Sequence, residues 1–397
     1  TPIETLAQKP FTWEAMIDWR HLTGDERDVL LKQLLIEQQA LSFDLARGPL
    51  LRASLVWLSE QEAMLLLVRH HIISEAWSGQ VFLRELTTLY TAFAAGKSSP
   101  LPDLPIQYVD FAVWQRKELQ GVKLKQQLDF WKEQLQGDLP VLDLPTDYPR
   151  PPLQSYHGRS QRCQLPEKLS EAITNLGRQE GATLFITLLT AFKLLLHRYS
   201  GHSDILVGIP STNRSRTELE GLIGFFLNTL VIRTDLAHDP TFRALLQRVR
   251  KVATQAYAHQ DLPFEKLVDE LEVRRDRSRH PLFQVMFTMN EDEAEVYQLP
   301  SLQVTRDRIE SVTETAKFDL TLFVTKTAGG YQATLNYNTD LFADDTIARM
   351  LGHFQTLLEN IVEAPDQCIS AIAILKPEER HQLLVEWNQT QTDYPRH

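Results

Sequence analysis

The stretch Arg-His-His-Ile-Ile-Ser-Glu-Ala-Trp-Ser, residues 69–78, decides how this sequence is interpreted. Two apolar runs precede it, Leu50–Leu58 and Ala63–Val68, and the polar turn between them predicts an antiparallel strand pair. After it, apolar residues recur at helical spacing over 82–93, with Ser78 as the expected N-cap. We therefore expect the histidine pair where a buried strand ends and a helix begins.

The adjacent histidines allow three interpretations. Neighbouring side chains on an extended segment point to opposite faces, so one imidazole enters the interior while the other faces a cavity. A histidine in a cleft acts as a general base or orients a developing charge, whereas a hydrogen-bonded pair is structural. The third interpretation is a zinc site with His71 and Glu75 as ligands, but the sequence has no His-Glu-x-x-His helix or clustered Cys to complete it.

The composition restricts the classes of protein. A length of 397 residues favours two domains. Lys and Arg number 41 against 52 Asp and Glu, and the net charge of -11 opposes binding to a phosphate backbone. Cys163 and Cys368 are too few for a disulfide scaffold and indicate a reducing compartment. No uncharged apolar run approaches the roughly 18 residues of a membrane span. We expect a cytoplasmic protein that binds neither nucleic acid nor membrane.

Both halves of the chain mix sheet and helix, which predicts the α/β (α+β) class. The sequence before Leu41 is expected to be irregular, and one helix is expected from Tyr108 to Leu135. Five prolines between Pro140 and Pro152 are the strongest linker signal. We therefore predict an N-terminal domain over 1–150, a C-terminal domain over 151–380 and a linker over 381–397. The elements expected in the second half are strands near 160–164, 204–210 and 281–289, helices over 166–179, 183–199, 241–257, 263–271 and 344–363, an extended segment over 224–233 and a hairpin over 318–337.

Six stretches in this order resemble the condensation domains of nonribosomal peptide synthetases. Besides residues 69–78, they are YVDFAVWQR (108–116), IGFFLNTLVIR (223–233), HQDLPFEKLV (259–268), RDRSRHPLFQVMF (275–287) and the tail NQTQTDYP (388–395). A histidine pair alone is a weak signal, whereas five ordered motifs are specific. The tail resembles the start of an adenylation domain.

The resemblance implies two chloramphenicol acetyltransferase-like lobes arranged as a V-shaped pseudo-dimer with a tunnel between them. It implies that upstream donor and downstream acceptor carrier domains present substrates on phosphopantetheine arms, so that the chain holds no intrinsic cofactor and no metal. The acceptor amine would attack the donor thioester to form an amide bond. An adenylation domain is expected to follow.

The resemblance also assigns site residues. His71 faces the reaction centre as the catalytic residue, and His70 is structural. Glu75 matches a structural acid that pairs with an arginine across the lobes, for which Arg214 is the candidate. The resemblance also implies that four residues lie at the oxyanion or line the tunnel, namely Ala76, Trp77, Ser78 and Asn228.

The chain departs from the family pattern in three respects. Glu75 and Ala76 stand where the family has Asp then Gly, which lengthens the buried acid and disfavours a positive φ. The opening motifs of the family are missing, so we expect a chain that starts inside the first lobe. Family variants that cyclise carry Asp in place of the first histidine, which this chain does not, and the 223–233 motif resembles the amide-forming type and not the epimerising one. The motifs that begin at Tyr108 and Arg275 fit the class that joins an L-donor to an L-acceptor. The alternative is an impaired platform that docks carrier domains or a tailoring enzyme.

Overall fold

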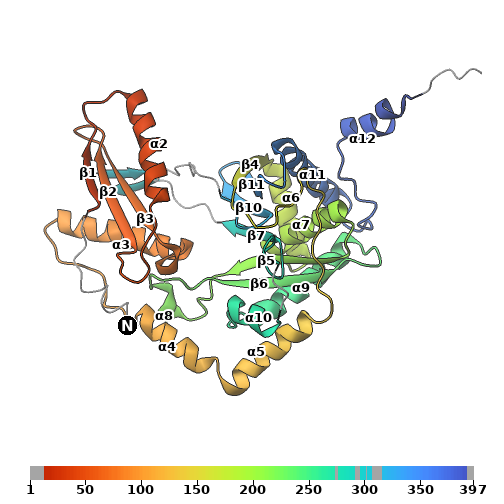
Figure 1. The fold of residues 1–397 in the computed structure, drawn as a ribbon, viewed down its shortest axis with the longest axis horizontal. Helices are drawn as coiled ribbons and strands as arrows, with labels where there is room; N and C mark the ends of the chain where they lie inside the picture. The colour runs from red at the N-terminus through yellow and green to blue at the C-terminus, as the bar shows by residue number, and fades with distance from the viewer. Residues whose placement is uncertain (1–12, 273–275, 291–295, 301, 306–314, 391–397) are drawn as a thin grey trace, which may run out of the picture. The chain divides into compact units, whose positions relative to one another are not determined.

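The computed structural model describes residues 13–272, 276–290, 296–300, 302–305 and 315–390. These residues divide into two compact units. Unit 1 comprises 1–118, 212–227 and 294–313, and unit 2 comprises 119–211, 228–293 and 314–397. Helices and sheets occur in both units, which confirms the predicted α/β class (Figure 1).

Unit 1 is built on a three-stranded sheet with the order β1-β2-β3. The antiparallel pair β2 (Leu51–Trp57) and β3 (Ala63–Arg69) confirms the predicted strand pair, and β1 (Ala15–Asp18) joins β2 in parallel. The β2 residues Ala53, Ser54 and Val56 are 2%, 2% and 0% exposed, so the centre of this strand is buried on both faces. In sequence, helix α2 (Gly24–Ala40) lies between β1 and β2, and helix α3 (Ala76–Ala94) follows β3. The hairpin β8 (Val296–Leu299) and β9 (Leu302–Thr305) also belongs to this unit.

A second part of unit 1 brings together segments that are distant in the sequence. Helix α4 (Tyr108–Glu118) supplies Phe111, and the segment 212–227, which contains the short helix α8 (Thr217–Glu220), supplies the remaining core residues. Their side chains form a separate hydrophobic cluster of Phe111, Leu219, Leu222 and Phe226. This cluster fixes the 212–227 segment within unit 1.

Unit 2 contains a six-stranded mixed sheet with the order β4-β11-β10-β7-β5-β6. Strand β7 is parallel to both β10 and β5, and the other pairings are antiparallel. The expected second-half strands, helices and hairpin are all present, with shifted ends. Their bounds are β4 (Gly158–Leu165), α6 (Glu167–Gln179), α7 (Leu184–Ser200), β5 (Asp204–Ser211), β6 (Asn228–Asp235), α9 (Phe242–Ala258), α10 (Phe264–Glu270), β7 (Val285–Asn290), β10 (Leu320–Thr327), β11 (Gly330–Asn338) and α11 (Asp344–Glu363).

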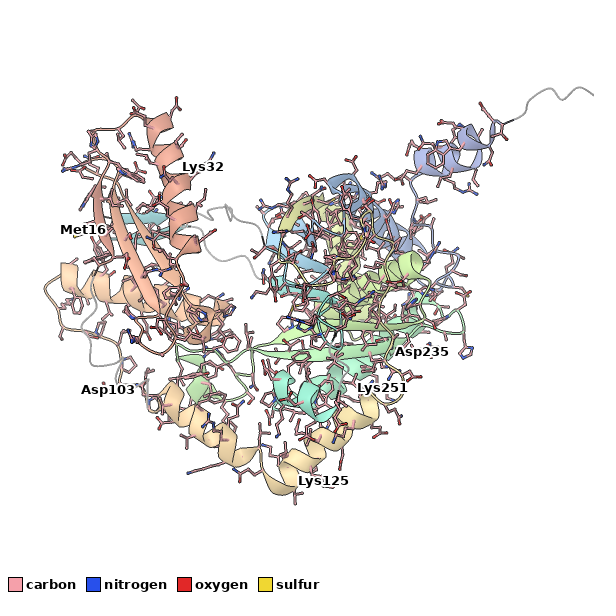
Figure 2. All side chains as sticks on the ribbon, viewed as in Figure 1. Met16, Lys32, Asp103, Lys125, Asp235 and Lys251 are labelled. Carbon is pink, nitrogen blue, oxygen red and sulfur yellow. The ribbon has the colours of Figure 1, made fainter. Side chains whose placement is uncertain are left out.

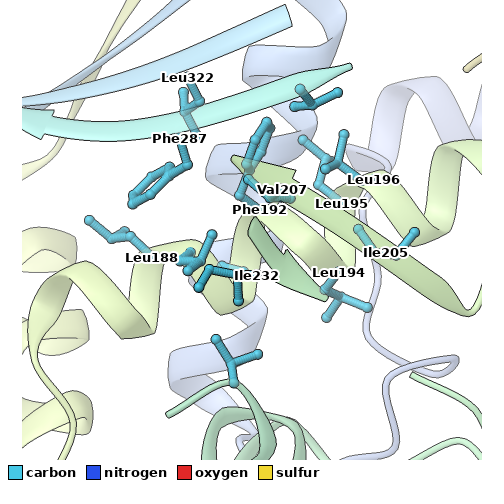
Figure 3. Close-up of a cluster of buried hydrophobic side chains, with 14 of the residues drawn as sticks. Leu188, Phe192, Leu194, Leu195, Leu196, Ile205, Val207, Ile232, Phe287 and Leu322 are labelled. Atoms are coloured by element: carbon cyan, nitrogen blue, oxygen red, sulfur yellow. The ribbon is translucent and has the colours of Figure 1, made fainter. Parts of the chain in front are cut away.

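Helix α7 is the centre of the unit 2 core. Every residue from Ile186 to Leu196 is buried, which explains why this helix is apolar on all sides. Figure 3 shows its side chains packed with those of the sheet, among them Ile205 on β5, Ile232 on β6 and Phe287 on β7. Charged side chains project instead from peripheral helices, such as Lys125 on α5 (Gly121–Gln134), which pairs with Asp129 at 2.5 Å (Figure 2).

The C-terminal helix α12 (Pro377–Leu384) and the following turn η2 (Glu386–Asn388) overlap the predicted linker over 381–397. A partly buried chain of hydrogen-bonded side chains holds the start of α12 on unit 2. Tyr199 Oη lies 2.6 Å from His353 Nδ1, and His353 Nε2 lies 3.1 Å from the Glu379 carboxylate. The predicted adenylation-like tail continues to residue 395, and its last residues, 391–395, lie outside the described residues.

Several expectations for the first half were wrong. Residues 24–40 are helical and not irregular. The helix predicted over 108–135 is two helices, because the chain breaks before Gly121, whose φ is +53°. Helix α3 begins at Ala76 with Glu75 as its N-cap, so Ser78 does not cap it.

The unit boundaries also differ from the predicted domain boundary near residue 150. Helix α5 belongs to unit 2, where the indole N–H of Trp131 donates to the His259 carbonyl at 3.0 Å. The first of the several transitions between the units therefore falls at 118–119 and not in the proline-rich stretch.

Among the described residues, no single helix has both the length and the hydropathy to cross a membrane, and the pair α6 and α7, bent by 104°, passes that test only together.

Candidate active site

His70 and His71 lie in different environments because the strand ends between them. Strand β3 stops at Arg69, and the 3₁₀ turn η1 spans His71–Ile73. His70 is half-buried, its N–H donates to the Leu50 carbonyl at 3.0 Å, and its Nδ1 accepts from the Ile72 N–H at 3.1 Å. His70 thus caps the turn, as a structural histidine does. His71 is exposed. The separation comes from the turn and not from the alternation of an extended strand that the sequence had suggested.

The His71 ring has an aromatic neighbour. Its centroid lies 5.2 Å from that of Phe225 at an interplanar angle of 89°, an edge-to-face contact. No hydrogen bond or ion pair of this imidazole occurs within the described part of the chain. The ring is therefore available to a substrate.

Glu75 and Arg214 form the expected ion pair. Arg214 Nε and Nη2 each lie 2.9 Å from Glu75 Oε1, and the two side chains are only 1% and 2% exposed. Both residues belong to unit 1, to which the 212–227 segment contributes from the second half of the chain. Glutamate is one methylene longer than the aspartate usual in the family, and its carboxylate still forms the ion pair with Arg214.

Burial dominates the electrostatics of this pair. It raises the pKa of the Glu75 carboxyl and lowers the pKa of the Arg214 guanidinium, and in each case the partner opposes the shift. The Arg214 guanidinium also donates to the carbonyls of Leu219 and Leu222, and it lies 4.0 Å from the centroid of the Phe226 ring. The 212–227 segment is thereby wrapped around a buried cation.

Ser78 fastens the same segment to α3. Its fully buried hydroxyl donates to the Gly224 carbonyl at 2.7 Å and accepts from the Gly224 N–H at 3.1 Å and from Arg214 Nη2 at 2.9 Å. A side chain at Gly224 has no room, because a Cβ there would lie 2.2 Å from Tyr108 Cδ2. Ser78 therefore acts as a structural link and not as an N-cap.

Ala76 and Trp77 open helix α3. Ala76 is the first helical residue and does not have a positive φ, so alanine fits where the family has glycine. The Trp77 indole N–H donates to the Glu220 carbonyl at 2.9 Å. The first N–H groups of a helix have no partner within it and attract negative charge.

Asn228 lies in unit 2 at the start of β6. Its Nδ2 donates to the carbonyls of Gln260 and Leu262, each at 2.7 Å, and its Oδ1 accepts from the N–H groups of Thr229 and Phe264 at 2.9 and 3.0 Å. These four bonds join β6 to the start of α10. A tunnel role for Asn228 stays a prediction, and its bonds favour a structural one.

The described residues contain no group of three or more His, Cys, Asp or Glu side chains placed to hold a metal ion. The zinc interpretation also loses its second ligand, because Arg214 engages the Glu75 carboxylate.

The family model of the condensation domain matches residues 4–384. The chain belongs to the condensation-domain family. It is 49% identical over 381 residues to one of the linear gramicidin synthase subunits of Brevibacillus parabrevis, an alignment that covers 96% of this chain and 7% of that protein. The chain thus spans a small part of this relative. Condensation domains of nonribosomal peptide synthetases are acyltransferase-type enzymes that form amide bonds, and the fold of this chain is theirs.

Solved structures agree with this membership. The X-domain in complex with OxyB from teicoplanin biosynthesis superposes with a TM-score of 0.81 at 28% identity, covering 93% of this condensation domain and 80% of that chain. Holo-AB3403, a four-domain nonribosomal peptide synthetase bound to AMP and glycine, also has a TM-score of 0.81, at 26% identity over 94% of this chain and 29% of that one.

The sequence thus located the histidine turn and the ion pair of this condensation domain, and it missed Phe225 and Tyr108 at the site. The Tyr108 hydroxyl donates to the Phe225 carbonyl at 2.8 Å, and burial raises the pKa of this phenol. Both residues lie within the family motifs 108–116 and 223–233, and no spacing rule connects them to His71. The motif predicted over 275–287 begins at Arg275, which lies outside the described residues.

Proposed function

We propose that this condensation domain joins a donor aminoacyl or peptidyl thioester to the amine of an acceptor aminoacyl thioester, with both substrates tethered to carrier domains. The observation that carries the proposal is the exposed His71 imidazole, which is held on a turn between β3 and α3 and has no protein hydrogen-bond partner among the described residues. The motifs favour an L-configured donor and acceptor.

In the proposed reaction, the lone pair of the acceptor amine attacks the carbonyl carbon of the donor thioester. The C–N bond forms, the C–S bond breaks, and the thiolate leaves on the donor arm. His71 orients the amine and accepts the proton that the nitrogen loses, and this proton then neutralises the thiolate. A positioned base contributes about 10²–10⁴-fold. Alignment of two tethered reactants contributes more, up to roughly 7–11 kcal/mol of the barrier.

The start of α3 supports the developing oxyanion in this proposal. Ala76 and Trp77 provide the first N–H groups of the helix, and the side chain of Glu75, the N-cap residue, accepts no hydrogen bond from them. Such fixed donors stabilise negative charge that appears only in the transition state.

The proposed partners are the upstream donor carrier domain, the downstream acceptor carrier domain and a following adenylation domain. The carriers supply the phosphopantetheine arms, so the domain itself needs no cofactor. We place the reaction in the cytoplasm, where the two free cysteines stay reduced.

The test uses the synthetase that contains this chain, with its carriers loaded with aminoacyl groups. Quenched samples are assayed for dipeptidyl product by mass spectrometry. His71→Ala is expected to lower the rate by about 10²-fold or more, while His157→Ala, an exposed histidine of unit 2, leaves it unchanged. Equal rates for His71→Ala and wild type would remove His71 from the mechanism.

A second candidate is a docking platform without condensation activity. The similarity to an X-domain solved in complex with OxyB favours it, as does Glu75 in place of the usual aspartate. Glu75→Asp separates the candidates. A large gain in condensation shows that the natural residue impairs catalysis, whereas carrier binding with no product in either form supports the platform.

A further inference from the structure

The aromatic side chain that contacts His71 belongs to the 212–227 segment. The imidazole has no hydrogen-bond or ion-pair partner within the described ranges, so its own backbone turn does not determine which way the ring faces. The aromatic ring in contact with it belongs to Phe225, at 5.2 Å and 89°. A catalytic base requires a defined ring orientation, since a misplacement of about 1 Å can cost 10²-fold in rate.

Phe225 is fixed on both sides. On one side, Ser78 binds both the N–H and the carbonyl of Gly224. On the other side, Phe226 is 2% exposed and packs against Phe111 with ring centroids 4.7 Å apart. The Phe225 carbonyl itself accepts the Tyr108 hydroxyl at 2.8 Å. The backbone of Phe225 therefore has little freedom to move.

The Phe225 side chain is not part of the core that its neighbours build. It is 36% exposed, unlike Phe226, and the buried cluster of this region does not include it. The Phe225 side chain contributes little to the core although its backbone is rigid, so its ring is free for another role. The edge-to-face contact with His71 identifies that role.

We propose that Phe225 is a positioning residue that sets the orientation of the His71 imidazole toward the acceptor amine. This inference rests on the proposed catalytic role of His71. Phe225 acts through the ring contact alone, and it takes no part in the proton transfer. The buried pair of Glu75 and Arg214 serves the same end indirectly, because it holds the segment on which Phe225 stands.

The test compares Phe225→Leu, which removes the aromatic ring, with Phe225→Tyr, which keeps it. Ile223→Ala is the matched control, since Ile223 is 38% exposed on the same segment and has no ring to contact His71. The first readout is the NMR spectrum of histidine labelled with ¹³C and ¹⁵N in the ring, in which His71→Gln assigns the His71 signals. We expect Phe225→Leu to move the ring-proton shifts of His71, and Phe225→Tyr and Ile223→Ala to leave them in place.

The second readout is the condensation rate with loaded carriers. Phe225→Leu is expected to lower kcat about 10-fold at unchanged KM, with recovery in Phe225→Tyr and no loss in Ile223→Ala. In a His71→Ala background, Phe225→Leu is expected to have no further effect, because the two residues act as one unit.

The outcomes separate the two proposals. Unmoved His71 signals in Phe225→Leu overturn the positioning role, and so does an equal loss of kcat with and without His71. If the His71 signals move but His71→Ala reacts as fast as wild type, the catalytic role of His71 fails and with it the positioning role, while the ring contact with Phe225 stands. Circular dichroism of each variant checks the fold, and a Phe225→Leu that is misfolded is replaced by Phe225→Met.

Discussion

The buried ion pair allows the most quantitative prediction. Glu75→Gln removes the negative charge and keeps the size of the side chain. The Arg214 guanidinium, 2% exposed, is then left among neutral acceptors, which are the carbonyls of Leu219 and Leu222 and the hydroxyl of Ser78. Removing one partner of a buried pair costs about 3–5 kcal/mol. Since the introduced amide still offers one oxygen to the arginine, we expect a loss near the lower end, about 3 kcal/mol in the free energy of unfolding.

Three further variants establish the cause. Glu75→Asp keeps the charge and removes one buried methylene, so its loss is expected to be about 1 kcal/mol. Arg214→Met leaves the carboxylate unpaired and is expected to be at least as damaging as Glu75→Gln. The double variant removes both charges and is expected to be more stable than the sum of the two losses predicts, by roughly 1–3 kcal/mol. Asp129→Asn breaks an exposed pair on α5 and should cost less than about 1 kcal/mol.

The assay is urea unfolding at one pH, followed by tryptophan fluorescence and by circular dichroism so that separate transitions of the two units are recognised. Two results would refute the reasoning. The first is a Glu75→Gln transition within about 1 kcal/mol of wild type, comparable to the surface control. The second is strict additivity in the double variant, which would show that the two charges do not depend on each other.

Two further predictions concern unit 2. Burial lowers the pKa of Lys193 to about 7, and its amino group donates to the carbonyls of Ile205 and Ile232. The unfolded chain holds this proton up to a pH near 10, whereas the folded state releases it near pH 7, so the unfolded state binds more protons between these values. The free energy of unfolding should therefore rise with pH across this window, by at most about 1.4 kcal/mol per pH unit, and level off below pH 7. Urea midpoints across this window measure the rise, and Lys193→Met should abolish it; an equal rise in the variant contradicts the assignment. Asn228→Ala should lower the unfolding free energy by about 2–4 kcal/mol, whereas unchanged stability with lost condensation would instead support a tunnel role.

The elements of unit 2 could be predicted because burial imposes a clear period on them. Helix α7 is apolar along its whole length, and β10 and β11 alternate on either side of Gly329 and Gly330. Helix α2 gave no such signal, since only Leu35 and Gln38 in it are buried. The signal that was overlooked is local. Glu26 accepts from the Thr23 N–H at 2.9 Å, which is the geometry of a capping box.

The predicted domain boundary differs from the unit boundaries for a different reason, which the segment 224–233 illustrates. Residues 224–227 and 228–233 form one apolar run in the sequence, yet they belong to different units. Hydrophobicity predicts burial for both parts, but it cannot show which residues they pack against. The contact of Tyr108 with the Phe225 carbonyl joins residues 117 positions apart, which no pattern within one window of sequence contains.

The histidine motif consists mostly of residues that build the site and do not react in it. His70 caps the turn, Glu75 neutralises a buried arginine and Ser78 holds Gly224 through both of its backbone groups. His71 is the exposed imidazole of the pair. This division explains how Glu75 can replace the usual aspartate. Glu75 acts only through its charge and its contact with Arg214, which lies on a segment held by several other hydrogen bonds. Such a residue tolerates one extra methylene, whereas a group that reacts with substrate would be displaced by it.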